Sequence, residues 1–72
     1  MKKSFKLEDL DCANCAAKME RVISQIAGVE SANVSFLAQK LTITAPDDQM
    51  DAIMDEVVRR CKRIEPDCVI VR

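Results

Sequence analysis

The sequence of 72 residues contains no histidine, tryptophan or tyrosine, and only two phenylalanines. The absence of histidine excludes imidazole acid–base catalysis, Cys–His nucleophile pairs and histidine-containing zinc sites. The shortage of aromatic rings removes the platforms on which nucleic-acid bases stack. Eleven basic and twelve acidic residues leave a net charge of −1, so the chain also lacks the basic excess that binds nucleic acid or anionic lipid.

Long apolar runs are missing as well. No stretch approaches the roughly 18 apolar residues of a membrane-spanning helix, so we expect this chain not to be inserted in a bilayer. Residues 1–8 are mostly polar, where a secretory signal would have an apolar core. We therefore expect one small cytoplasmic domain over residues 1–72, with little room for an enzyme's substrate pocket.

The spacing of apolar residues predicts six elements. Alternation of apolar and polar side chains indicates strands, and apolar residues three or four positions apart indicate amphipathic helices. We predict strands over residues 4–10, 29–37, 40–45 and 68–71, and helices over 13–27 and 48–62. Gly28, the only glycine, is expected to cap the first helix with a positive φ. The order β-α-β-β-α-β predicts an α+β, ferredoxin-like sandwich: a four-stranded antiparallel sheet with two helices on one face.

Two of the four cysteines, Cys12 and Cys15, form a CxxC motif between the first predicted strand and the first predicted helix. The unpaired amides and positive dipole of a helix N-terminus favour thiolate over thiol. A pair of thiolates is a soft ligand set that selects ions such as Cu(I), Zn(II), Cd(II), Pb(II) and Hg(II) over Mg or Ca. The motif therefore predicts a metal site.

CxxC motifs also occur in structural zinc sites and in thiol–disulfide oxidoreductases. A structural zinc site usually has four ligands from two such motifs, but Cys61 and Cys68 are separated by six residues. Ala13 and Asn14, between the first two cysteines, do not resemble the thioredoxin type. Metal binding is therefore the preferred interpretation, with a small thiol–disulfide oxidoreductase as the alternative of another class.

Three segments together resemble the heavy-metal-associated domain: residues 10–20 (LDCANCAAKME), 26–30 (IAGVE) and 32–36 (ANVSF). That family includes soluble metallochaperones and the N-terminal metal-binding domains of heavy-metal P-type ATPases. The resemblance spans nearly the whole chain and implies the same ferredoxin-like fold. It also implies a chain with no catalysis of its own, within a full-length protein that is an ATP-driven metal-translocating P-type ATPase.

The residues before the CxxC motif distinguish subgroups of the family. Copper-binding members usually carry Met two residues before the first cysteine and Thr directly before it, whereas this chain has Leu10 and Asp11. Asp at that position resembles the zinc-, cadmium- and lead-exporting ATPases, which implies Zn(II), Cd(II) or Pb(II) as cargo. Asp11, Cys12 and Cys15 are thus the predicted ligands. The alternative role for Asp11 is a helix N-cap.

Cys61 and Cys68 are kept as additional ligand candidates, because in this fold they come near the first strand–helix loop. The competing interpretation is apolar packing, since Cys61 continues the apolar stripe of the second helix. Glu65 and Asp67 are weaker carboxylate candidates in the same region. Met50 and Met54 are spaced as core residues rather than as copper ligands.

The partners implied are the metal ion and the rest of a membrane-bound metal-transporting ATPase, for which this chain is a regulatory or delivery domain. The alternative is a free-standing metallochaperone, including one for Cu(I). We expect a monomer, although an open site with two thiolates also permits a metal-bridged dimer.

Overall fold

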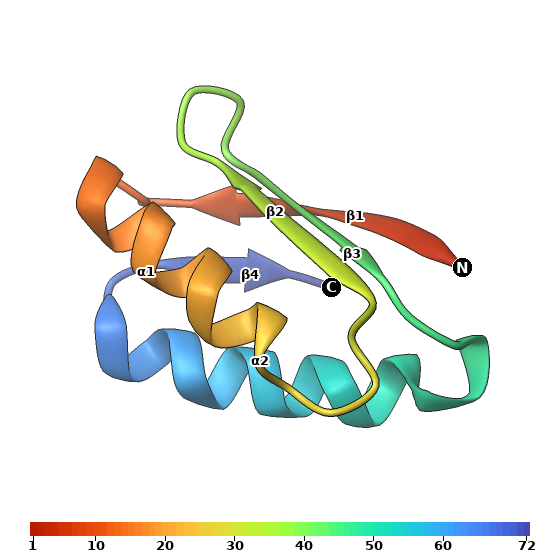
Figure 1. The fold of residues 1–72 in the computed structure, drawn as a ribbon. Coiled ribbons are helices and arrows are strands. Elements are labelled where there is room, and N and C mark those ends of the chain that lie inside the picture. The colour runs from red at the N-terminus through yellow and green to blue at the C-terminus, as the bar shows by residue number, and fades with distance from the viewer.

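The computed structural model describes all 72 residues, and Figure 1 shows two helices packed against one sheet. The chain forms, in order, β1 (Lys2–Glu8), α1 (Ala13–Ser24), β2 (Ser31–Ser35), β3 (Lys40–Thr44), the 3-10 helix η1 (Asp47–Gln49), α2 (Met50–Ile64) and β4 (Val69–Val71). The strand order is β2-β3-β1-β4, and each neighbouring pair is antiparallel. The predicted ferredoxin-like fold is confirmed.

The hydrophobic core lies between the helices and the inner face of the sheet. Along the central strands, buried Leu7, Leu41 and Ile43 alternate with polar neighbours, as a half-buried strand requires. The helices contribute one apolar stripe each: Ala16, Met19 and Ile23 from α1, and Met50, Ile53, Met54, Val57 and Cys61 from α2. All buried side chains are apolar, and the prediction that Met50 and Met54 are core residues is confirmed.

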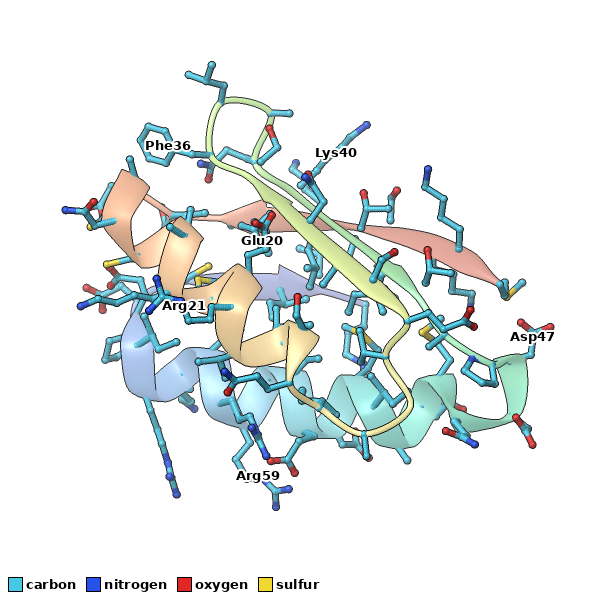
Figure 2. All side chains as sticks on the ribbon, viewed as in Figure 1. Glu20, Arg21, Phe36, Lys40, Asp47 and Arg59 are labelled. Atoms are coloured by element: carbon cyan, nitrogen blue, oxygen red, sulfur yellow. The ribbon has the colours of Figure 1, made fainter.

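The edge strand β2 is tied to α1 by a side chain. The backbone N–H of Val34 donates to Oε1 of Glu20 at 2.8 Å, and Figure 2 shows Glu20 pointing from α1 toward β2. Edge strands leave unpaired backbone groups that attract other strands. Glu20 therefore satisfies one such donor and fixes α1 against the sheet.

The first helix ends three residues before its predicted end. Its last turn tightens, with Gln25 N–H donating to Val22 O at 3.2 Å and Ile26 N–H to Ile23 O at 3.1 Å. The C-cap is Gln25, so the predicted capping role of Gly28 is wrong. Gly28 does have a positive φ of 95°, but it lies in the turn that follows.

The other boundaries shift for local reasons. β1 ends at Glu8 because Asp9 takes a left-handed φ of 62°, which an extended strand cannot continue. β4 begins at Val69 because Cys68 N–H bonds to Glu65 O at 3.1 Å within a turn. Residues 47–49 form η1, so α2 starts at Met50 and extends to Ile64, two residues past each predicted bound.

Three connections lie toward the same end of the molecule. In Figure 1 the start of α1, in orange, and the link from α2 to β4, in blue, lie side by side at the left, and the β2–β3 hairpin rises beside them. Gln39 of that hairpin bonds to Leu10 in the β1–α1 connection. The candidate ligands thus come from connections that the sheet order brings together. No helix combines the length and apolar character needed to cross a membrane.

Candidate metal centre

Cys12 is both the first cysteine of the motif and the residue that starts α1. Its backbone is extended, with φ −132° and ψ 115°, and its Sγ accepts the N–H of Cys15 at 3.2 Å. The Cys12 carbonyl then accepts the Ala16 N–H at 3.1 Å, the first bond of the helix. A sulfur thus takes the N-cap position where Ser, Thr, Asp or Asn usually lies. The alternative role of Asp11 as the N-cap is therefore wrong.

The two thiols of the motif differ in proton affinity. Hydrogen bonds from the Cys15 side chain and backbone lower the pKa of Cys12. The same side-chain bond, together with desolvation and the nearby Cys12 charge, raises the pKa of Cys15 to about 11. Once Cys12 is ionised, the pair shares a proton that Cys15 donates toward the Cys12 thiolate. A cation that binds both sulfurs has to displace this proton.

The chain leading into the motif is held by Gln39 of the β2–β3 hairpin. Its Oε1 accepts the Leu10 N–H at 3.2 Å and its Nε2 donates to the Leu10 carbonyl at 2.7 Å. Its own backbone carbonyl accepts the Leu7 N–H at 2.8 Å. Leu10 is itself buried in the core. The residue two positions before Cys12 is therefore fixed by both packing and hydrogen bonds.

Gln39 was not found by sequence reasoning. It lies 29 residues from Leu10, and it adopts a left-handed φ of 53°, a conformation for which glutamine carries no special preference. A polar residue at the end of a hairpin ordinarily indicates only a solvated turn. The contact depends on the hairpin folding back over the β1–α1 connection, which no short motif records.

Asp11 is exposed, and its carboxylate makes no hydrogen bond or ion pair. No three Cys, Asp or Glu side chains in the molecule gather closely enough to form a ready-made metal cluster. The structure therefore brings Cys12 and Cys15 together, and leaves the Asp11 carboxylate next to them in sequence but apart from the sulfurs.

Glu65 is the carboxylate that faces the cysteine pair. Through its charge and a side-chain hydrogen bond it contributes to the raised pKa of Cys15, and its charge also acts on Cys12. The turn after α2 holds it there, because Glu65 N–H donates to the Cys61 carbonyl at 2.9 Å. Asp67, in the same connection, is exposed and contacts neither cysteine.

Cys61 lies in the last turn of α2, and Cys68 lies just before β4. Cys61 is only 3% exposed and packs in the core, while Cys68 is half-buried before β4. The electrostatics of Cys68 include the charge of Asp9, in the connection that leads to the CxxC motif. The four cysteines do not form a ready-made four-sulfur cluster, and all are free thiols, so a ligand role for Cys61 or Cys68 stays a prediction.

Comparison with known proteins identifies relatives of this arrangement. The family model for the heavy-metal-associated domain matches residues 4–63. A cadmium, zinc and cobalt-transporting ATPase of Bacillus subtilis (strain 168) is 33% identical over 66 residues, which are 92% of this chain and 9% of the ATPase. A zinc/cadmium/lead-transporting P-type ATPase of Escherichia coli (strain K12) is 42% identical over 45 residues, which are 62% of this chain and 6% of the ATPase. The matched segments are thus less than a tenth of each ATPase.

A solved structure has the same fold. The N-terminal domain of a potential copper-translocating P-type ATPase from Bacillus subtilis, in the Cu(I)-loaded state, has a TM-score of 0.72 and 25% identity, with 89% of this chain and 78% of that chain covered. These relatives carry names of both divalent-metal and copper transport. Heavy-metal binding is what they share, and it agrees with the resemblance found in the sequence. The match over residues 4–63 shows that this chain belongs to the heavy-metal-associated domain family, as a non-catalytic metal-binding module.

Proposed function

We propose that this chain binds Zn(II), Cd(II) or Pb(II) as cargo through the thiolates of Cys12 and Cys15, with an oxygen ligand from Asp11. The observation that carries the proposal is the Cys12–Cys15 pair at the start of α1, where Cys12 Sγ accepts the Cys15 N–H and the pKa of Cys12 is lowered. Two relatives named for zinc and cadmium transport support the choice of divalent ions. Residues 1–72 act as one domain in this proposal.

Charge and ligand preference favour a divalent ion over Cu(I). Two thiolates and one carboxylate around a divalent ion leave a net charge of −1, whereas the same set around Cu(I) leaves −2. Cu(I) is satisfied by soft sulfur ligands, while Zn(II) usually takes four ligands and accepts carboxylate oxygen. The Asp11 carboxylate makes no other bond, so it is free to turn toward the sulfurs. Asp11 thus adds affinity for one class of ion and discriminates against the other.

Glu65 competes with Asp11 for the role of oxygen ligand. Its carboxylate already faces Cys15, whereas the advantage of Asp11 is its direct link to Cys12 in the chain. A divalent ion with two sulfurs still has coordination positions to fill, so both carboxylates can contribute. The proposal assigns the first oxygen to Asp11 and makes Glu65 a further candidate that the same experiment separates.

The test is metal titration of the reduced chain, read by sulfur-to-metal charge-transfer absorbance. Cys12→Ser with Cys15→Ser is expected to abolish binding and leave the fold intact, since neither side chain is fully buried and Ser is a common N-cap residue. Asp11→Asn is expected to weaken Cd(II) and Zn(II) binding about tenfold or more, the lower end of what the loss of a supporting residue costs at metal sites. Cu(I) binding should change little.

Carboxylate controls complete this experiment. Glu65→Gln measures how much the Glu65 carboxylate contributes to metal affinity. Asp67→Asn is the matched control, because Asp67 lies in the same connection without touching either cysteine. Equal losses of Cd(II) and Cu(I) affinity in Asp11→Asn would remove Asp11 from the coordination sphere. A loss of Cd(II) affinity in Glu65→Gln but not in Asp11→Asn would mean that Glu65, rather than Asp11, supplies the oxygen ligand.

The larger protein in this proposal is a membrane-bound, ATP-driven metal efflux pump, with this chain as its cytosolic N-terminal domain. The relatives named as ATPases support it. A second candidate is a Cu(I)-binding domain or chaperone, which the Cu(I)-loaded structural relative favours. The same titration decides between them, because a copper domain binds Cu(I) tightly whether or not Asp11 is present.

A further inference from the structure

The second pair of cysteines shares a pocket of its own. Cys61, on the buried face of α2, and Cys68, just before β4, both line a cavity of about 240 Å³. The charge of Cys68 also contributes to the raised pKa of Cys61. Neither Cys12 nor Cys15 lines this pocket. This is therefore a site distinct from the proposed cargo site.

The walls of this pocket are mostly apolar. Apart from the two cysteines, it is lined by Val58, Pro66, Val69, Ile70 and Lys62. No carboxylate, hydroxyl or amide side chain lines it. Zn(II) and other ions that want three or four ligands or an oxygen find only two sulfurs here. The pocket suits a soft cation that is satisfied by two sulfurs in a line.

Charge further restricts which metal ion the pocket can hold, because burying a net charge in an apolar pocket is costly. Cu(I) with two thiolates is an anion, and the negative charges of Glu65 and Asp9, which already act on Cys68, would oppose it. A doubly charged cation with two thiolates is neutral. Hg(II) combines that charge with a strong preference for two sulfur ligands.

We propose that Cys61 and Cys68 form a second soft-metal site, which takes Hg(II) as a neutral, two-coordinate bis-thiolate in the pocket between α2 and β4. Two S–H bonds break and two Hg–S bonds form. Two protons pass to solvent, and no electrons are transferred, so no oxidant or reductant is needed. The bound ion links the end of α2 to β4.

The protonation of these thiols keeps weaker metals out. Burial is the main cause that raises the pKa of Cys61 to about 12, and burial also raises the pKa of Cys68. Both sulfurs are therefore thiols at neutral pH, and a metal has to displace two protons to bind. At the first pair the pKa of Cys15 is also raised, but that of Cys12 is lowered. A metal therefore meets less competition from protons at the first pair than at the second.

The test uses the chain with Cys12→Ser and Cys15→Ser, so its outcome does not depend on the proposed cargo site. Hg(II) is added in the presence of millimolar glutathione, which competes for mercury held by a single thiol. We expect one mercury per monomer and two protein thiols protected from alkylation, both measured by mass spectrometry, and a higher Tm. Further replacement of Cys68 by Ala should abolish retention, while Val69→Ala in the same background is the matched control for the pocket wall.

Three results would overturn the proposal: mercury removed completely by glutathione, one mercury for each thiol, or mercury that bridges two chains in size-exclusion chromatography. If the variant with Cys12→Ser and Cys15→Ser does not fold, the number of Hg(II) ions held by the native chain tests the same proposal. That chain should then hold two Hg(II) ions per monomer, whereas a chain with only the Cys12–Cys15 site holds one.

Discussion

The side-chain amide of Gln39 bonds both backbone polar groups of Leu10, accepting its N–H at 3.2 Å and donating to its carbonyl at 2.7 Å. These two bonds take the place of backbone hydrogen bonds between strands, because β1 has already ended at Glu8. It also joins two connections that are distant in sequence. The position of the metal-binding loop thus depends on a hairpin that supplies none of the proposed ligands.

Replacement of Gln39 is expected to loosen this loop. Gln39→Met keeps the length of the side chain and removes its hydrogen bonds, which should cost about 1–3 kcal/mol because the backbone groups of buried Leu10 lose their partners. Cd(II) affinity should fall as well. Urea denaturation and metal titration measure the two effects. Lys40→Met is the control, since Lys40 is the exposed neighbour. An unchanged free energy of unfolding in Gln39→Met would show that the loop is held by packing alone.

Metal binding by the first pair should strengthen as pH rises. With the pKa of Cys12 lowered and that of Cys15 near 11, the free pair holds about one proton between those two values. Binding through both thiolates releases that proton, so the affinity for Cd(II) should rise about tenfold per pH unit in the range where Cys12 is ionised and Cys15 is not. Calorimetric titrations in buffers of different ionisation enthalpy would measure the number of protons released on binding. A pH-independent affinity would mean that Cys15 binds without losing its proton.

Alkaline pH should weaken the fold through Cys61. Burial raises its pKa from 9.0 to about 12, so above pH 9.0 the unfolded chain loses this proton while the folded chain keeps it. The folded state then binds more protons, and the free energy of unfolding falls as pH rises from 9.0 to about 12. The Cys61→Ala variant has no thiol at this position, so this group no longer makes its stability depend on pH. The stability difference between the native chain and the variant should therefore shrink with pH, and parallel pH curves would contradict the assignment.

Gly28 is expected to tolerate no side chain. Its φ of 95° strains any L residue, and a Cβ would collide with the Gln49 side chain and approach Ile53 Cδ1 to 3.2 Å. Gly28→Ala should cost about 1–3 kcal/mol, as other residues forced into such conformations do. Adding Gln49→Ala should recover only part of this loss, because the backbone strain remains. Full recovery in thermal denaturation would assign the whole cost to the collision.

The fold could be predicted from apolar spacing because each element has a clear inward face, as Leu41 and Ile43 show on β3. Boundaries were less accurate where local bonds compete with propensity. Asp9 ends β1 by taking a left-handed conformation, and the Cys68 N–H turns back to Glu65. Neither choice is visible in a pattern of apolar and polar residues.

The CxxC motif predicted the proximity of Cys12 and Cys15 because the two residues lie in one helical turn. Contacts between distant segments were harder to predict. The position of Glu65 against Cys15 depends on where α2 ends, and the bond from Gln39 to Leu10 depends on how the hairpin folds back. Asp11 was expected beside the sulfurs from resemblance, and its role as a ligand stays a prediction.

The sulfur that starts α1 has a consequence for how the domain communicates. Because Cys12 Sγ holds the Cys15 N–H, arrival or departure of a cation on that atom alters the electron density available to the opening turn of the helix. Binding of a metal ion would therefore change the hydrogen bonding of the first turn of α1. A protein that contacts this helix could then distinguish the metal-bound domain from the metal-free domain without contacting the ion.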